Sequence, residues 1–320
     1  MDVTDMDVTG KNAVVTGGAG FVGSHLAERL LAENASVTVI DDLSNGKAEW
    51  VPNGATFIED DLTDPAVAAD AIVPETDIVF HFAAGKDVND PNPRSQFGAN
   101  TAMTLNVLER MVEVDVEAIA YTSSSTVYGE APRPTPEDYP QRPISMYGTS
   151  KTAEEGLIST FVTAHDLTAW IYRFANIVGP RLQPGAVIVD FIQKLQADPT
   201  SLEILGDGRQ EKSYMHIEEC VDAMLYVIAH ADQDFNLYNL GTETTTSVNR
   251  IADVVSETMG LDPEYKYTGG DRGWAGDVPK MRLSIEKLGA LGWEPTDSSD
   301  DAVRRATAEL VEEFGTETSN

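Results

Sequence analysis

The stretch NAVVTGGAGFVG, residues 12–23, decides the fold of this chain. Its apolar first half predicts a buried strand, and a turn with Gly17, Gly20 and Gly23 follows at once. Apolar residues at helical spacing then continue to about Asn34. A strand, a glycine turn and a helix in this order are typical of a dinucleotide site, because the turn lets a pyrophosphate reach the amides of the helix N-terminus.

Strands and helices alternate through the first 180 residues. We expect helices over 21–34, from 64, over 96–112 and after Tyr147. The expected strands are 12–16, 36–40, 55–59, 77–82, 117–122 and 168–174. Such alternation predicts an α/β fold with a doubly wound parallel sheet covered on both faces.

The regularity changes after the segment 179–181. Short strands are expected at 202–205 and 236–240, and helices at 217–229, 248–259 and 301–314. We therefore expect a dinucleotide-binding domain over 11–180 and a smaller lobe, mainly for substrate, over 181–315. The chain is expected to cross back to the first domain near 215–245. Residues 1–10 repeat the letters MDVT and predict a flexible extension.

The composition is strongly acidic. Asp and Glu number 53 against 22 Lys and Arg, giving a net charge of −31. Nucleic acid and anionic membranes are therefore not expected as partners, because both would be repelled. No apolar run has transmembrane length and no signal-peptide core precedes the first strand, so a cytoplasmic protein is expected. The single cysteine, Cys220, excludes an internal disulfide and is expected in the core.

Two explanations fit this charge: an ordinary acidic cytosolic enzyme, or adaptation to high salt. The scarcity of lysine, nine in 320 residues, favours high salt.

The end of the second strand indicates which cofactor is bound. A carboxylate at Asp41 would accept hydrogen bonds from the adenosine ribose and repel a 2′-phosphate, which favours NAD over NADP. Asp61 could accept from the adenine amino group or cap the next helix before Thr63, and the sequence leaves both open. His81 is expected to pack rather than act as a base. The expected cofactor-binding residues are Gly17, Gly20, Phe21, Val22, Gly23, Asp41, Asp42, Asn45, Gly46, Asp60, Asp61, Leu62, Phe82, Ala83, Ala84, Lys86, Asn100, Tyr147 and Lys151.

Three residues form a candidate catalytic group. Tyr147 and Lys151 are four residues apart on one helix face, and Ser124 closes the fifth strand. A free tyrosine has a pKa of about 10 and is a poor base at neutral pH. A cation one turn away favours the phenolate, so Lys151 is expected to lower the pKa of Tyr147. Ser124 can hydrogen-bond the same substrate oxygen.

Together these motifs resemble the extended short-chain dehydrogenases/reductases, specifically the nucleotide-sugar epimerases and dehydratases. The resemblance spans 11–295 and is greatest to UDP-glucose (galactose) 4-epimerases of the archaeal type. It implies a Rossmann fold, bound NAD, a UDP-hexose substrate and a homodimer formed through the helices at 96–112 and 147–165. Met103, Val107 and Met111 recur there at helical spacing, although an intrachain core explains them as well. The segments that carry the resemblance are 17–23, 39–46, 81–84, 123–129, Tyr147 with Lys151, 172–181, 205–208 and 276–279.

The resemblance also implies roles for substrate-binding residues. Asn176 would lie near the diphosphate and Arg272 at the nucleotide end, and either Arg209 or Lys212 would contact the ribose or phosphates. Met281 falls where the family sets pocket size, so N-acetyl sugars are a further candidate substrate. The substrate-binding set is Ser124, Ser125, Asn176, Arg209, Lys212 and Arg272, and no metal ligands are assigned.

The residues after Ser124 indicate the reaction type. Family dehydratases place Asp-Glu there and decarboxylases keep an acid at the second place, whereas this chain has Ser125 and Thr126. Neither hydroxyl is acidic enough to replace a carboxyl group. We therefore expect a redox-neutral 4-epimerase, with a dehydratase, decarboxylase or reductase of the same family as the alternative. A non-catalytic NAD-binding sensor is a less favoured alternative, because such proteins usually lose the Tyr or the Lys and this chain retains both with Ser124. A structural protein would have no need for the three residues.

If the acidic surface is adapted to high salt, the melting temperature should rise with KCl well beyond 1 M. Carboxylate repulsion reaches about 30 Å at 0.01 M salt but only about 3 Å at 1 M. Differential scanning fluorimetry across a KCl series measures this, and a melting temperature indifferent to salt would contradict the adaptation.

Overall fold

The computed structural model describes residues 7–85, 92–273 and 278–317. Its centre is a sheet of seven parallel strands in the order β11-β6-β5-β4-β1-β2-β3. Since the chain builds outward from β1 in both directions, the predicted doubly wound sheet is confirmed, and its order reverses between β1 and β4. The strands are β1 (Asn12–Thr16), β2 (Ser36–Asp41), β3 (Thr56–Glu59), β4 (Ile78–His81), β5 (Ala118–Ser124), β6 (Thr168–Phe174) and β11 (Phe235–Leu240).

The strand register places a row of polar residues across the middle of the sheet. Thr16 on β1 is opposite His81 on β4, and His81 is opposite Tyr121 on β5. All three are fully buried. Because neighbouring parallel strands hold these positions side by side, their polar groups can connect one strand to the next beneath the carboxyl edge.

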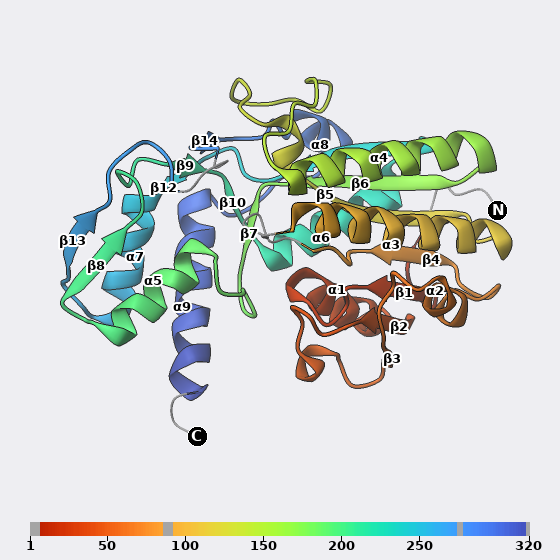
Figure 1. Ribbon diagram of the computed structural model, residues 1–320, viewed down its shortest axis with the longest axis horizontal. Helices are drawn as coiled ribbons and strands as arrows, with labels where there is room; N and C mark the ends of the chain where they lie inside the picture. The colour runs from red at the N-terminus through yellow and green to blue at the C-terminus, as the bar shows by residue number, and fades with distance from the viewer. Residues whose placement is uncertain (1–6, 86–91, 274–277, 318–320) are drawn as a thin grey trace.

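Helices cover both faces of the sheet (Figure 1). One face packs on α1 (Phe21–Ala32) and α6 (Ile217–His230), with Leu26 and Met224 in its core. The other packs on α2 (Pro65–Ala71), α3 (Pro93–Glu113) and α4 (Met146–His165), with Leu108 and Ile158 in its core. Cys220 is buried on α6, as expected.

A second group of elements has its own core, at the left of Figure 1. It contains α5 (Val187–Ala197), α7 (Val248–Met259), α9 (Ser299–Glu317) and the parallel pair β8 (Ser201–Ile204) and β13 (Glu264–Tyr267). Shorter pairings lie between the groups. They are β7 (Asn176–Val178) with β10 (Tyr214–His216), and β9 (Glu211–Lys212) with β12 (Thr246–Ser247) and β14 (Lys280–Met281). The helix α8 (Glu286–Leu291) packs near β11.

The chain leaves the sheet after β6 and returns to it with α6 and β11. This path supports the division that we propose, with a cofactor domain over 11–180 and a substrate lobe over 181–315 that crosses back near 215–245. Residues 1–6 of the expected extension lie outside the described residues.

Some elements differ from the sequence-based expectation. α5 was not anticipated, although five of its residues are buried in the second core. α4 begins one residue before Tyr147, because the Ser145 hydroxyl caps it by accepting from the Gly148 amide at 3.1 Å. Tyr147 therefore stands in the first turn of its helix.

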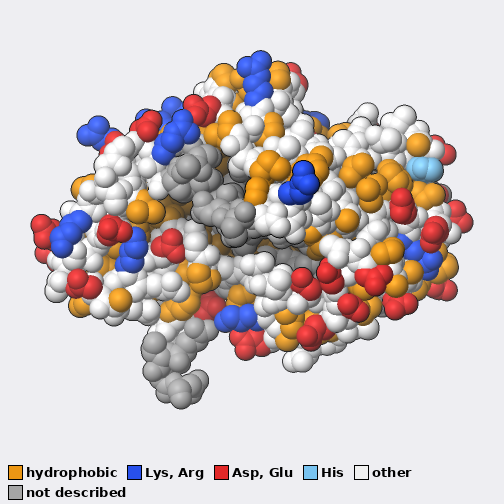
Figure 2. All heavy atoms as spheres, viewed as in Figure 1, with side chains coloured by type: hydrophobic (Ala, Val, Ile, Leu, Met, Phe, Trp, Pro, Cys, Tyr) orange, Lys and Arg blue, Asp and Glu red, His pale blue; other side chains and the backbone are white. Residues whose placement is uncertain are grey.

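Charge is unevenly spread on the face shown in Figure 2. Acidic side chains gather at the lower right, over the end of the molecule that holds β1 to β3, and several Lys and Arg side chains lie at the upper left. Within the described residues, no helix has the length and apolarity that crossing a membrane requires.

Candidate active site

The glycine turn is held by close contacts between backbones. A β-carbon on Gly23 would lie 2.2 Å from the Gly17 carbonyl oxygen, and one on Gly17 would lie 2.7 Å from the Ala83 amide nitrogen. The sequence suggested that a β-carbon would block a pyrophosphate. The structure adds a stronger reason, since these two glycines let α1 and the end of β4 approach the turn itself. Gly46 belongs to the same arrangement, because its β-carbon would lie 2.7 Å from the Ala19 carbonyl oxygen.

The second strand fastens the turn through Asp41. One carboxylate oxygen accepts from the Ala19 amide at 3.0 Å and the other from the Leu43 amide at 2.9 Å. Burial raises the pKa of Asp41, and the two amides act against that rise. A carboxylate offers about four lone pairs, so Asp41 can also accept from a ribose hydroxyl. Asp42 and Asn45 lie exposed in the loop that follows.

The acidic residues after β3 exclude one of the two roles that the sequence leaves open for Asp61. Asp61 accepts from the Thr63 amide at 2.9 Å, and the cap of α2 is Asp64, which accepts from Ala66. The helix-cap reading of Asp61 is therefore wrong. Asp60 and Asp61 are exposed at the carboxyl edge, and Leu62 is buried in the core beneath them.

The end of β4 is fixed by two buried side chains. The Thr16 hydroxyl accepts from the amides of Phe82 and Ala83, each at 3.1 Å. Asn100 on α3 binds both polar backbone atoms of Gly85 and donates to Ser150 on α4 at 3.1 Å. Asn100 thus holds the segment containing Ala84 against both helices. Lys86 lies outside the described residues.

Ser124, Tyr147 and Lys151 meet at the carboxyl end of β5. The Ser124 oxygen accepts from the Thr126 amide and hydroxyl, at 3.2 and 3.0 Å, and its hydrogen bond to Tyr147 favours the phenolate. The Lys151 nitrogen lies 5.9 Å from the centre of the Tyr147 ring. Lys151 is 1% exposed and donates to the Tyr121 hydroxyl at 3.0 Å.

The expected effect of Lys151 on Tyr147 needs correction. Burial, and then the charge of Glu154, raise the pKa of Tyr147 above its ordinary value, while the Ser124 hydrogen bond acts the other way. The reason is that the Lys151 amine is directed to Tyr121 and lies 3.7 Å from the Glu154 carboxylate, which offsets its charge. Burial and Glu154 therefore disfavour the phenolate of Tyr147, and any positive charge placed close to the ring would favour it.

A buried ion pair supports the site from below. Arg173 on β6 binds Glu155 on α4 through two contacts of 2.9 and 2.6 Å and donates to Tyr128 at 2.8 Å. Ser123 also donates to Glu155. This network joins β5, β6, α4 and the short helix η3 (Ser125–Tyr128), so the backbone that carries Ser124 is held on several sides.

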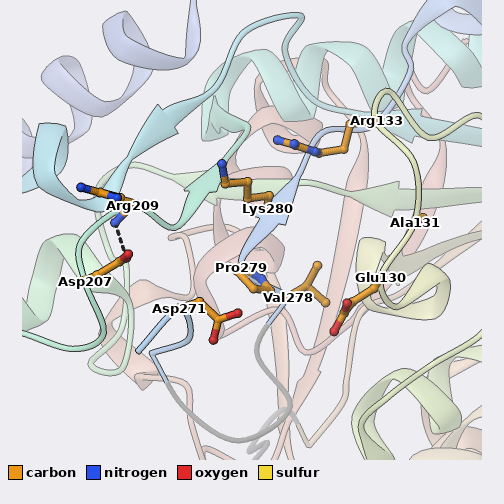
Figure 3. Close-up of a pocket in the computed structure, with 9 residues that line it drawn as sticks. All are labelled: Glu130, Ala131, Arg133, Asp207, Arg209, Asp271, Val278, Pro279 and Lys280. Carbon is orange, nitrogen blue, oxygen red and sulfur yellow. Dashed lines mark hydrogen bonds between the residues drawn. The ribbon is translucent and has the colours of Figure 1, made fainter. Parts of the chain in front are cut away.

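A pocket of about 420 Å³ lies beyond η3. In Figure 3, Arg133, Lys280 and Arg209 occupy the upper part of the view, and Asp271 and Glu130 the lower part. The pocket is lined by Glu130, Ala131, Arg133, Asp207, Arg209, Asp271, Val278, Pro279 and Lys280. Of the proposed substrate residues it contains Arg209, and Arg272 follows Asp271 and forms an ion pair with Glu130.

The remaining proposed substrate residues lie on β7, β9 and η3. Asn176 on β7 donates to the Ser213 carbonyl at 3.2 Å, and Ser125 opens η3. Lys212 on β9 is partly buried opposite Met281. Met281 itself is buried in a small core with Val127 and Tyr128.

Sequence reasoning missed two sets of residues. Arg133 and Lys280 share the pocket, but their distance in the sequence gives no signal. The buried polar residues around Lys151 were also missed, although Glu154 could have been noticed as an acid one turn after Lys151 on the same helix. His81 lies among these buried polar residues but was considered in the sequence analysis. Burial and the Lys151 charge lower its pKa to about 3, which agrees with the packing role expected for it.

Gly23→Ala should destabilise the protein by about 1–3 kcal/mol, because the added methyl group has no room beside the Gly17 carbonyl. It should also weaken NAD retention, since the turn would have to open. The matched control is Gly289→Ala in α8, where a β-carbon meets nothing nearer than 4.0 Å. Chemical unfolding and NAD content measure both variants, and equal behaviour of the two would contradict the packing argument.

Comparisons with known proteins agree with this geometry. A putative UDP-glucose 4-epimerase of Methanocaldococcus jannaschii is 31% identical over 299 residues, covering 91% of this chain and 96% of that protein. A crystal structure of a UDP-galactose 4-epimerase matches with a TM-score of 0.86 and 39% identity, over 95% of this chain and 99% of that one. UDP-glucose 4-epimerase from Thermotoga maritima, solved with UDP-glucose, matches with a TM-score of 0.87 and 30% identity over the same shares. The model of the NAD dependent epimerase/dehydratase family matches residues 13–241, and the chain belongs to that family.

Proposed function

We propose that this protein is an NAD-dependent isomerase that interconverts UDP-glucose and UDP-galactose through a transient 4-keto sugar. The observation that carries the proposal is the meeting of Ser124, Tyr147 and Lys151 at the carboxyl end of β5, with hydroxyl residues where an eliminating enzyme needs acids. The names of the similar proteins support the same substrate class.

The residues at the switch point fit NAD. The turn brings the first amides of α1 to the crevice, and Asp41 offers carboxylate oxygens at the end of β2. When bound, NAD supplies a positively charged ring and an acceptor for the C4 hydride, which it returns. Before the cofactor binds, the backbone of its site is already fixed by the hydrogen bonds of Asp41, Phe82, Ala83 and Asn100.

Tyr147 and Ser124 move the proton. The Tyr147 phenolate takes the proton of the C4 hydroxyl and gives it back after the sugar has turned over. Ser124 has one hydroxyl proton, which favours the phenolate when it is donated to Tyr147 and holds the C4 oxygen when it is donated to the sugar instead. The burial that raises the pKa of Tyr147 also keeps water from competing for this proton.

The nucleotide must stay anchored while the sugar turns. We propose that the pocket beyond η3 holds the nucleotide diphosphate, with Arg209 as a cationic contact and Arg272 fixed nearby by Glu130. Lys212 on β9 and Asn176 on β7 complete the proposed set. Arg209 lines the pocket, which favours it over Lys212 for the phosphate contact.

A dehydratase of the same family is the main alternative. Such an enzyme needs an acid and a base beside the sugar, and the places after Ser124 hold Ser125 and Thr126. The Thr126 hydroxyl donates to Ser124, so it supports the proton path. Return of the hydride is therefore the expected fate of the 4-keto sugar.

Purified protein should interconvert UDP-glucose and UDP-galactose without added NADH and without loss of water. Proton NMR of incubations with UDP-, dTDP- and GDP-hexoses measures this directly. UDP-N-acetyl sugars belong in the same panel, because Met281 is a candidate for setting pocket size. A 4-keto-6-deoxy sugar or a pentose as the main product would overturn the assignment.

Tyr147→Phe is the matched control for the chemistry. The ring keeps its packing but loses its proton-transferring oxygen, so turnover should fall by about 100-fold or more while NAD stays bound. Substantial remaining turnover would exclude Tyr147 as the base.

We further propose a cytoplasmic homodimer with a surface adapted to high salt. The dimer would pair α3 and α4, which pack on one another and carry the partly buried Met103, Leu157 and Phe161. Val107 and Met111, named with Met103 as interface candidates, are fully buried in the chain's own core and contribute nothing to this surface.

Multi-angle light scattering in concentrated KCl should give about twice the 34.6 kDa mass of one chain. A charged substitution at Phe161 should shift the protein toward monomer, since it would place a charge in the apolar interface. A single-chain mass for the unchanged protein would contradict the dimer.

A further inference from the structure

A carboxylate lies buried directly beneath the catalytic lysine. Glu154 is 0% exposed, and one of its oxygens lies 3.7 Å from the Lys151 nitrogen. That oxygen also accepts from the Thr104 hydroxyl on α3 at 3.1 Å. The other oxygen is buried and has no hydrogen-bond partner among the described residues. A buried charge in this state is costly unless an opposite charge compensates it.

The groups around Glu154 leave Lys151 as that compensating charge. Tyr121 faces it from β5 and His81 from β4, while α3 contributes the neutral Thr104. His81 is uncharged, because burial and Lys151 lower its pKa to about 3. Glu155, the adjacent acid on α4, is already matched by Arg173. Tyr147 completes the set, and the Glu154 charge contributes to its raised pKa.

The Glu154 carboxylate in turn favours the protonated form of Lys151. Burial lowers the pKa of the lysine, and Glu154 is the largest opposing influence. Its amine is also oriented, since it donates to Tyr121 at 3.0 Å and lies over that ring. Only a protonated lysine carries a charge that can act against the raised pKa of Tyr147.

We propose that Glu154 is a positioning residue for the reaction: its buried carboxylate keeps Lys151 protonated and directs the ammonium toward Tyr121 and Tyr147. The chain from Thr16 through His81 and Thr104 to Glu154 extends this role, with links of 2.8, 3.0 and 3.1 Å. It connects the turn-supporting end of β1 to the catalytic lysine, so one buried network serves the cofactor and the proton path. The catalytic meaning of the inference rests on the proposed epimerase function.

The test measures the charge of Lys151 directly. The chain has nine lysines, so ¹³C NMR of labelled lysine side chains can follow each titration, with Lys151→Met assigning the signal. In Glu154→Gln the midpoint of Lys151 should fall by about one pH unit or more. The exposed Glu109→Gln on α3 is the matched control and should leave it unchanged. Glu154→Asp, which keeps the charge, should restore most of the midpoint.

The pH dependence of turnover tests the catalytic meaning. In Glu154→Gln the alkaline limb of the kcat profile should move to lower pH in parallel with the Lys151 midpoint. A merely structural role would lower the melting temperature without moving that limb. If Glu154→Gln does not fold, Thr104→Val removes the hydroxyl that fixes the carboxylate and should give a smaller shift in the same direction.

The outcomes separate the two proposals. An unchanged or higher Lys151 midpoint overturns the inference, whatever the substrate is. A lowered midpoint with an unmoved alkaline limb overturns the positioning role. Absence of UDP-hexose turnover in the unchanged protein overturns the proposed function, while the NMR titration still decides whether Glu154 controls the lysine.

Discussion

The site depends on how closely backbones approach one another at the glycine turn. α1 can begin where it does because Gly23 presents no side chain to the Gly17 carbonyl, and β4 can end beside the turn because Gly17 presents none to Ala83. The loop after β2 closes on the same turn, through Gly46 and through the Lys47 amide, which donates to the Ala19 carbonyl at 3.0 Å. Three strand ends thereby converge, and each later residue of the site is placed relative to them.

The second constraint is that a buried charge must be compensated, and two buried acids of this chain are each paired with a cation. Arg173 with Glu155 and Lys151 with Glu154 place two acids and two cations inside a chain whose surface is strongly acidic. The two pairs differ in geometry. Arg173 makes two short contacts with its partner, as its planar guanidinium allows, and holds the backbone of β5 and β6. Lys151 lies at 3.7 Å from Glu154 and keeps its donors for Tyr121 and the reacting groups. The Arg173–Glu155 pair is therefore suited to holding the backbone, and the Lys151–Glu154 pair leaves the lysine able to contact the reacting groups.

Much of the fold was predictable because it depends on local pattern. The strands of the sheet are short apolar runs, and those from β1 to β6 were placed within two residues at most ends. The helix α5 was not anticipated, because its apolar face has meaning only against α7 and α9, which come far later in the chain. Asp41 and Ser124, which end β2 and β5, could also be chosen as candidates from the sequence. Arg133 and Lys280 were not, since only the fold brings them together.

The electrostatics of the site could not be derived from spacing alone. A lysine four residues after a tyrosine suggests a lowered tyrosine pKa. In the structure the pKa of Tyr147 is raised instead, because the burial of its ring and the charge of Glu154 have the larger effect. The same helix turn that carries Lys151 also carries Glu154, and the nearby carboxylate offsets the charge of the lysine. Positive charge placed close to such a phenol favours its phenolate. The positively charged ring of bound NAD would add such a charge, so we expect occupation of the cofactor site to favour proton transfer by Tyr147.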